Sequence, residues 1–169
     1  MNSEFFKIYG AKERQDGIVV LSSNKACIYV GFGKDSEDAE SGYNWRKDYD
    51  HIPTIAEVKA DIEELINAHT DAKILTGFSW NGKPVYLSSE NQFNFKAAYD
   101  LAVQTSGKTL PVKFKLGEDR RGNAVYHTFE DLAEFTDFYT KAIAYVSDCL
   151  NEGWEEKDSI DYDSLLTDE

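Results

Sequence analysis

Two pairs of closely spaced glycines could form a phosphate-binding loop, because glycine lets the backbone approach a phosphate. Gly31-Phe32-Gly33 follows a predicted strand, but Lys34-Asp35-Ser36 stands where a dinucleotide fingerprint needs its third glycine. Gly117 and Gly122 have the spacing of a phosphate loop, yet Asn123-Ala124 replaces the required Lys and Ser or Thr. Neither segment predicts a nucleotide site. The second is predicted to be a hairpin turn, and we expect no cofactor.

Metal ligation is the next chemistry to consider. One loop is crowded with carboxylates that could hold calcium loosely, namely Asp35, Glu37, Asp38 and Glu40. The alternation and the glycine of an EF-hand loop are missing, so a solvated acidic loop is the favoured interpretation. The three histidines, His51, His69 and His127, fall in separate predicted elements without the spacing of a zinc site. No metal site is predicted.

Nucleophiles and acid–base groups do not form a catalytic pattern in the sequence. There is no G-x-S-x-G elbow, and neither Cys27 nor Cys149 has a nearby basic residue that would lower its pKa. Both cysteines are predicted to be free, buried thiols. Glu130, Asp131 and Glu134 fall at the start of a predicted helix, where their charges complement the helix dipole. We therefore expect no enzymatic activity.

The large aromatic side chains offer a binding role instead. Trp80 and Trp154 are interpreted as anchors that pack a hairpin against a long helix, with an exposed Trp-Tyr patch for a glycan or a partner protein as the alternative. The acidic C-terminal stretch is a mobile tail or an arm that docks on a partner. The candidate partner-binding residues are Trp80, Trp154, Tyr162, Leu165 and Leu166.

Charge and hydropathy narrow the classes of partner. The formal net charge is -13 at pH 7, and no cluster of Lys and Arg exists to attract a duplex or an anionic bilayer. The start of the chain lacks the basic and apolar regions of a signal peptide, and no apolar run is long enough to cross a membrane. We expect a soluble protein made in a cytoplasm, with no nucleic-acid or membrane partner.

The elements that must position these residues begin with β structure over residues 5–32. Residues 33–50 are predicted to be a surface loop and linker whose aromatic side chains dock on a neighbour. Thr54 and Glu57 form a capping box that starts a half-buried helix, which should end near His69-Thr70.

The middle of the chain carries a strong hairpin signal. Asn81-Gly82 favours a type I′ turn between two short strands, and Pro84 places the second arm at an edge. Ser89 and Gln92 form a second capping box, and the helix that it starts should stop before Gly107, at the left-handed C′ position.

A second hairpin and a long helix complete the pattern. Residues 112–116 alternate between apolar and charged side chains and pair, across a polar turn, with residues 124–127. Thr128 is predicted to cap a helix over residues 129–154, whose wide apolar seam fits a globular core better than an oligomer zipper. A homo-oligomer through this helix stays an alternative.

These elements predict an α+β fold. A small antiparallel β unit at the N-terminus is followed by a linking helix and by two β-hairpins packed with two helices, the last one long. The predicted domains are an N-terminal β unit with an acidic loop (1–50), a connecting helix (51–73), a hairpin-helix-hairpin-helix domain (74–158) and an acidic tail (159–169).

The C-terminal half resembles a phage and prophage family known as domain of unknown function 4376. The residues that carry the resemblance are Phe78-Ser79-Trp80-Asn81-Gly82, Leu87-Ser88-Ser89-Glu90-Asn91-Gln92, Pro111-Val112-Lys113-Phe114-Lys115, Thr128-Phe129-Glu130-Asp131-Leu132 and Trp154-Glu155-Glu156-Lys157-Asp158-Ser159-Ile160. The segment before them looks like one found in some phages of gut bacteria. Such proteins are encoded among tail, tail-fibre and other virion genes, and the family defines no catalytic residues.

The resemblance implies a non-enzymatic virion or tail-associated protein, made in the host cytoplasm, that binds other phage virion proteins. A tail-fibre assembly chaperone that is absent from the mature particle is the alternative. A glycan-binding module built around Trp80 and Trp154 is a second alternative, and it predicts both indoles in one open cleft.

Overall fold

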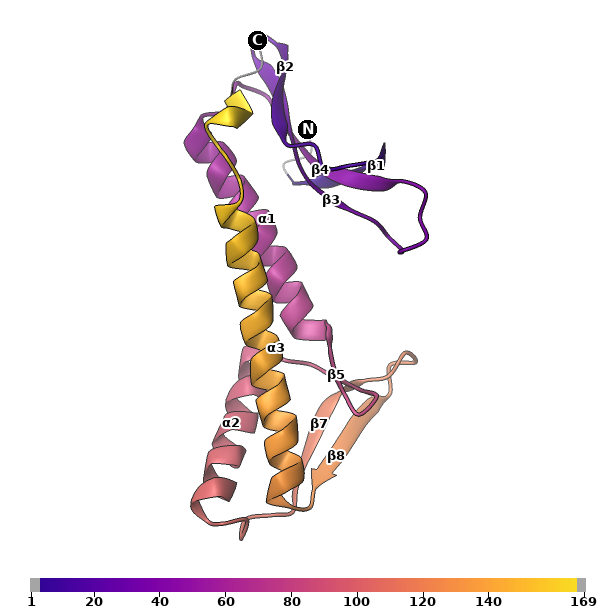
Figure 1. The fold of residues 1–169 in the computed structure, drawn as a ribbon, viewed down its shortest axis with the longest axis vertical. Coiled ribbons are helices and arrows are strands. Elements are labelled where there is room, and N and C mark those ends of the chain that lie inside the picture. The colour runs from indigo at the N-terminus through magenta and orange to yellow at the C-terminus, as the bar shows by residue number, and fades with distance from the viewer. Residues whose placement is uncertain (1–3, 167–169) are drawn as a thin grey trace. The chain divides into compact units, whose positions relative to one another are not determined.

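The computed structural model describes residues 4–166 and confirms the α+β fold (Figure 1). The chain divides into two compact units: unit 1 contains residues 4–66 and 156–166, and unit 2 contains residues 67–155. The elements in chain order are β1 (Phe6–Ala11), β2 (Gly17–Ser22), β3 (Lys25–Gly33), β4 (Gly42–Tyr49), α1 (Ile55–Thr76), β5 (Phe78–Trp80), β6 (Lys83–Val85), α2 (Ser89–Gln104), β7 (Val112–Glu118), β8 (Ala124–Phe129), α3 (Leu132–Asp158) and the 3₁₀ turn η1 (Ser164–Leu166).

Unit 1 is built on an antiparallel sheet in the order β1-β4-β3-β2. The prediction of a loop over residues 33–50 is wrong for its second half, since β4 lies in the sheet interior and pairs with both β1 and β3. Trp45, expected to dock on a neighbouring surface, lies opposite Lys7 and Val30 in this sheet. Strand pairing on both sides outweighs the polar composition of the segment.

The helix α1 starts as predicted and ends later than predicted. The Glu57 amide donates to Thr54 Oγ1 (3.3 Å) and the Thr54 amide donates to Glu57 Oε2 (2.9 Å), which confirms the capping box. The helix continues past His69-Thr70 to Thr76 because no breaker intervenes before Gly77. At Gly77 a side chain would collide with the Tyr145 hydroxyl and the Lys73 carbonyl.

The core of unit 1 lies between one face of the sheet, the first half of α1 and the C-terminal segment. Its buried residues are Ile28, Val30, Tyr49, Val58, Ile62, Ile66, Ile160 and Leu165. The interpretation of the C-terminal stretch as a mobile tail or a partner-binding arm is therefore wrong for Ile160 and Leu165. Burial of apolar area holds this segment in unit 1.

Unit 2 opens with the predicted hairpin. Asn81 and Gly82 have φ angles of 49° and 73°, so both central turn positions are left-handed, as a type I′ turn requires. Phe78 lies opposite Val85 across the two strands. The arm that carries Pro84 ladders only with β5, which fits a residue without an amide hydrogen.

The α2 helix follows with caps shifted by one residue from the prediction. The N-cap is Ser88, whose Oγ accepts from the Asn91 amide at 3.2 Å, and Ser89 is the first helical residue. At the other end Ser106 and Gly107 both have positive φ, and the Gly107 amide donates to the Ala102 carbonyl. Ser106 therefore takes the C′ position predicted for Gly107.

The β7–β8 hairpin is confirmed, but the start of the long helix is not. Thr128 lies inside β8, opposite Lys113, and does not cap α3. Phe129 is buried in the core and pairs with Val112, so the sheet holds the residues that the prediction gave to the helix. Asp131 caps α3 by accepting from the Glu134 amide at 2.9 Å.

Aromatic rings fill the core of unit 2, where α2, α3 and the second hairpin meet. Phe95 of α2 contacts Phe114 of β7 and Phe138 of α3 with ring centroids 5.0 and 5.1 Å apart. Phe129 stacks on Phe135 at 4.5 Å. Edge and stacked ring pairs add to the apolar burial, so this cluster positions α2 and the second hairpin against α3.

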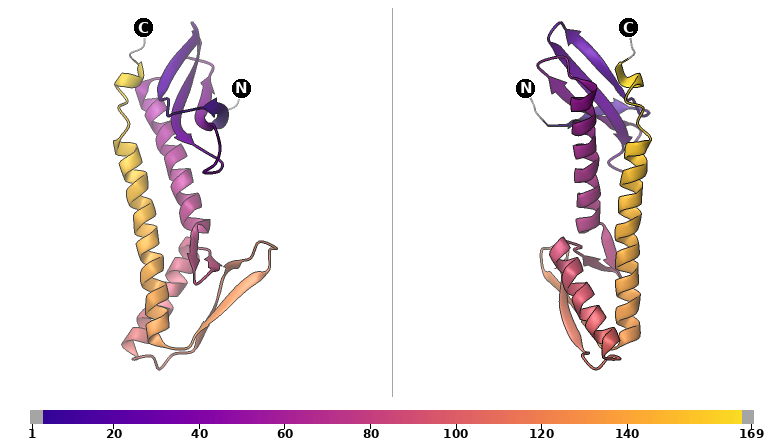
Figure 2. Two further views of the ribbon diagram at one scale, coloured as in Figure 1. Left: turned by 45° about the vertical axis from the view of Figure 1, so that its right-hand side comes forward. Right: turned by 90° about the vertical axis from the view of Figure 1, so that its left-hand side faces the viewer.

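The seam of α3 packs within the chain, as the globular-core interpretation predicted. Its buried residues are Phe135, Phe138, Ala142, Cys149 and Gly153. In unit 2, the last turns of α1 lie beside α3, with Thr70 against Gly153 and an ion pair between Lys73 and Glu152 (Figure 2). Both cysteines are free and buried, as expected.

Candidate functional site

The two candidate tryptophans have different environments. Trp80 is 2% exposed, donates a 2.9 Å hydrogen bond from Nε1 to Asp137 Oδ2, and packs on Phe138 at 5.4 Å. Trp154 is 56% exposed. The anchor interpretation holds for Trp80 and is wrong for Trp154. The glycan cleft lined by both indoles is also wrong, because a buried ring cannot stack on a ligand.

The C-terminal candidates lie against α1 in unit 1. Leu165 is buried in the core, and Tyr162 is half-buried with Lys59 Nζ 5.6 Å from its ring centroid. Burial raises the pKa of the Tyr162 hydroxyl above its ordinary value. The side chain of Leu166 lies outside the described residues. Tyr162 and Leu165 thus serve the fold of unit 1.

Three polar residues of unit 2 form a hydrogen-bonded cluster that the sequence did not predict. Lys83 Nζ lies 2.7 Å from His127 Nδ1, and His127 Nε2 lies 2.9 Å from Glu134 Oε1. This geometry fits a neutral imidazole that accepts from Lys83 and donates to Glu134. The three residues come from β6, β8 and α3, so no local spacing could indicate them. Each ring nitrogen of His127 has a partner, and the three residues together join both hairpins to α3.

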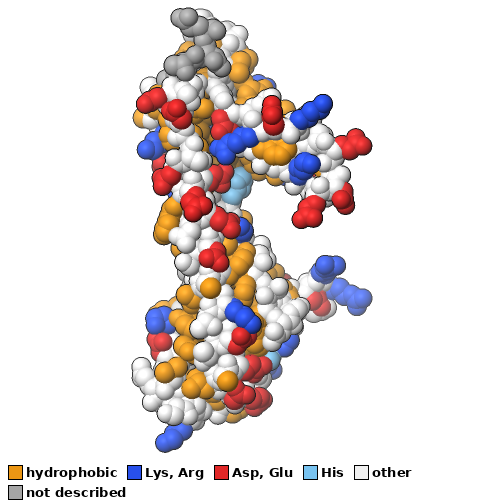
Figure 3. All heavy atoms as spheres, in the orientation of Figure 1, with side chains coloured by type: hydrophobic (Ala, Val, Ile, Leu, Met, Phe, Trp, Pro, Cys, Tyr) orange, Lys and Arg blue, Asp and Glu red, His pale blue; other side chains and the backbone are white. Residues whose placement is uncertain are grey.

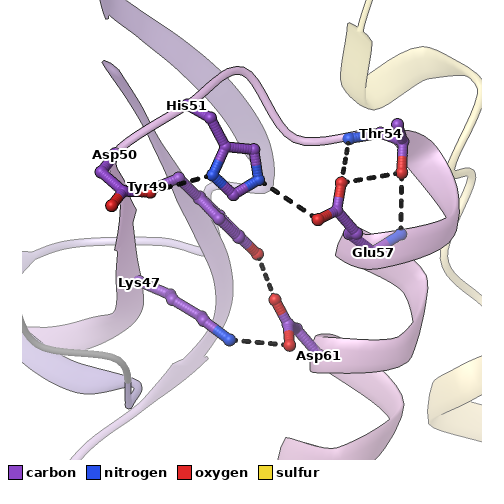
Figure 4. Close-up of polar contacts among 7 residues, drawn as sticks. All are labelled: Lys47, Tyr49, Asp50, His51, Thr54, Glu57 and Asp61. Carbon is purple, nitrogen blue, oxygen red and sulfur yellow. Dashed lines mark hydrogen bonds and ion pairs between the residues drawn. The ribbon is translucent and has the colours of Figure 1, made fainter. Parts of the chain in front are cut away.

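A second polar cluster joins β4 to α1 within unit 1 (Figure 4). The Tyr49 hydroxyl donates to Asp61 Oδ2 at 2.6 Å, and Lys47 Nζ lies 2.7 Å from Asp61 Oδ1. Burial, with the Asp61 carboxylate as a second cause, raises the pKa of Tyr49 well above its usual range. Tyr49 therefore stays protonated and holds the sheet to the helix.

The same view shows His51 between two carboxylates (Figure 4). Its Nδ1 lies 3.0 Å from Asp50 Oδ1, and its Nε2 lies 3.2 Å from Glu57 Oε1. The Asp50 contact, more than the Glu57 contact, raises the pKa of His51 above its ordinary value. Both ring nitrogens are used, so His51 fastens the loop before α1.

The acidic loop keeps its predicted character. Asp35 forms an ion pair with Lys7 at 2.7 Å, which lowers the pKa of the Asp35 carboxyl. Among residues 4–166, no group of three or more His, Cys, Asp and Glu side chains is placed to hold a metal ion. Figure 3 shows carboxylates spread over the visible face among Lys and Arg side chains.

The edge strand β2 exposes three consecutive apolar side chains. Val19, Val20 and Leu21 are 45%, 62% and 53% exposed. The strand pairs only with β3 and lies at one end of the sheet order, so one row of its backbone groups has no strand partner. Sequence reasoning placed β structure here, but it could not tell an edge strand from an interior one.

Within the described part of the chain, no helix combines the length and apolar character needed to span a bilayer.

Comparison with known families supplies the assignment. The model of a domain of unknown function, DUF4376, matches residues 57–169, which is more than half of the chain. The chain belongs to the DUF4376 family. The match begins in the first turn of α1, so the DUF4376 region includes all of unit 2 and the helical part of unit 1, while β1–β4 precede it. No curated protein and no solved structure matches the chain.

Proposed function

We propose that this DUF4376 chain is a non-enzymatic structural protein of a bacteriophage particle. It is associated with the tail or another part of the virion and acts through contacts with other virion proteins. The observation that carries the proposal is the edge strand β2, in which the consecutive residues Val19, Val20 and Leu21 are exposed. Monomeric proteins usually protect such an edge with charges, proline or a covering element. The 3₁₀ turn η1 contacts β2, but it leaves these three side chains exposed.

The β2 edge suits a protein partner of defined geometry. Its unpaired amide and carbonyl groups fit an extended strand of another chain, which would add to the sheet by main-chain hydrogen bonds. Gly17–Ser22 has no charged side chain, so pairing would bury no charge there. The partner strand would present apolar side chains to Val20 and Leu21.

His127 and Asp61 are engaged in hydrogen bonds and ion pairs with neighbouring side chains. His127 is held between Lys83 and Glu134, and Asp61 is shared by Tyr49 and Lys47. Each of these clusters joins a strand to a helix, which favours a scaffold role over an enzymatic one. The phage setting rests on the family resemblance, which associates such proteins with tail and virion genes.

Mass spectrometry of purified virions tests the proposal. Particles from a phage that encodes this chain should contain its peptides in a fixed ratio to a known tail protein after density-gradient purification. A tail-fibre assembly chaperone would be abundant in infected cells and missing from the particles, and that result would contradict the virion role. Host ribosomal proteins in the same fractions measure carry-over from the lysate.

A further inference from the structure

A hollow of about 490 Å³ lies in unit 1, and its walls include Ile8, Gly10, Gln15, Tyr29 and Asn44. Ile8 and Asn44 are cross-strand partners, and Tyr29 lies opposite Arg46, two residues along β4 from Asn44. Because side chains alternate along a strand, these three share one sheet face. That face is opposite to the one where Ile28 and Tyr49 enter the core. The hollow is therefore separate from the core of unit 1.

The Asn44 side chain gives the hollow a fixed hydrogen-bonding group. Asn44 is 3% exposed, and its Nδ2 donates to the carbonyls of Gly31 (2.6 Å) and Glu13 (3.3 Å). These two bonds use both amide hydrogens and set which way the amide points. Its Oδ1 accepts no hydrogen bond from the described residues and is not sealed from solvent. Because solvent reaches this oxygen, a ligand hydroxyl can take the place of water as its hydrogen-bond donor.

The other walls combine apolar, aromatic and backbone surface. The Tyr29 ring is held in place by Arg46, whose Nη1 donates to its hydroxyl at 3.0 Å and whose guanidinium carbon lies 5.5 Å from the ring centroid. Gly10 has a φ of 98° at a register shift in β1, and open space surrounds the position of a side chain there. A glycine at such a bulge lets a ligand approach the backbone closely.

We infer that this hollow binds a small neutral ligand rich in hydroxyl groups, namely a sugar unit of a glycan. A sugar ring has hydroxyl donors for Asn44 Oδ1 and a C–H face for Ile8 and Tyr29. Lys12 and Glu13 also line the hollow and carry opposite charges, which favours a neutral ligand over an anion or a cation. The volume lies within the range of roughly 300–1,000 Å³ that is typical of small-molecule sites.

This site differs from the glycan site that the sequence suggested at Trp80 and Trp154. It lies on β1, β3, β4 and the loop after β1, and all of these precede the segment that matches DUF4376. It also goes beyond the proposed structural role, since a virion protein could bind its partners through β2 with the hollow empty. Sugar binding and virion incorporation can therefore fail separately.

NMR on the full-length protein tests the inference. The probes are the methyl glycosides of glucose, galactose and N-acetylglucosamine at millimolar concentration. At least one glycoside should show saturation transfer from the protein. The same glycoside should change the chemical shifts of the backbone amides of Gly10 and Gln15 and of the side-chain amide of Asn44. If no glycoside receives saturation, or if the shifts map to unit 2, the inference is overturned.

A pair of variants sharpens the test. Ile8→Glu places a charge on the wall of the hollow, and Val103→Glu places the same charge on an exposed position of α2 in unit 2. Binding should weaken by roughly fivefold or more in the first variant and stay unchanged in the second. Equal binding by both variants contradicts the inference. If Ile8→Glu does not fold, the shift map of the unaltered protein decides the question.

Discussion

The Tyr49 hydroxyl donates a 2.6 Å hydrogen bond to Asp61 Oδ2, and this contact joins the last residue of β4 to the second turn of α1. Tyr49 is buried, and Asp61 also forms an ion pair with Lys47. One carboxylate thus fastens two residues of the sheet to the helix. The neutral form of Tyr49 is the one that the folded state stabilises.

Tyr49 should make stability depend on alkaline pH. Because folding raises the pKa of Tyr49 above its ordinary value of 10.0, its contribution is fully present below about pH 10 and is lost as pH rises beyond that value. Urea unfolding should therefore show that the free energy of unfolding falls more steeply from roughly pH 8 to pH 11 in the unaltered protein than in Tyr49→Phe, because phenylalanine has no hydroxyl to ionise. Parallel curves for the two proteins would contradict this assignment.

His51 should titrate above its ordinary pKa of 6.5, since it lies between Asp50 and Glu57. NMR titration of its ring protons measures the midpoint. Asp50→Asn should lower the midpoint more than Glu57→Gln does, because the Asp50 contact is the larger cause. Gln is also accepted at the capping-box position, so the helix start is kept. Stability from this contact is complete below pH 6.5 and declines as pH rises through the folded-state pKa.

Trp80 and Trp154 should differ sharply when truncated. Trp80→Ala removes a buried ring and should cost about 3–5 kcal/mol of unfolding free energy. Trp154→Ala changes an exposed side chain and should stay within about 0.5 kcal/mol. Urea unfolding followed by circular dichroism measures both without depending on indole fluorescence. Similar losses in the two variants would show that the contrast in burial is wrong.

Leu165 should stabilise a sheet that lies far away in sequence. Leu165→Ala removes a side chain from the core of unit 1 and should cost about 2–5 kcal/mol. Hydrogen exchange should then accelerate at the amides of Ile28 and Val30. Leu75→Ala, at an exposed position of α1 in unit 2, is the matched control and should leave those amides unchanged. Unchanged exchange in Leu165→Ala would mean that the C-terminal segment does not support the sheet.

Local chemistry explains which elements could be read from the sequence. The Asn81-Gly82 turn and the Thr54–Glu57 box depend on residues within four positions of each other, and both are present as predicted. Ser88 and Ser89 are adjacent cap candidates, and the sequence alone could not separate them. Thr128 was a plausible cap until cross-strand pairing placed it in β8.

Long-range contacts explain the rest. The β4 segment contains polar residues that looked like a loop, yet Asn44 bonds to the Gly31 carbonyl and Lys47 pairs with Asp61. These partners are distant in sequence, as are Lys83 and His127 in the second cluster. The exposure of β2 depends on sheet order, which strand propensity does not report. Fold class was therefore predictable, and the candidate sites were not.

Photo-crosslinking in phage-producing cells tests the central claim most directly. A photo-reactive amino acid in place of Val20 should attach this chain to another virion protein, and the adduct should be recovered from purified particles. The same group in place of Val103, on α2, should give little of that adduct. Particles that contain no adduct from Val20, or equal adducts from both positions, would contradict a structural role that acts through β2.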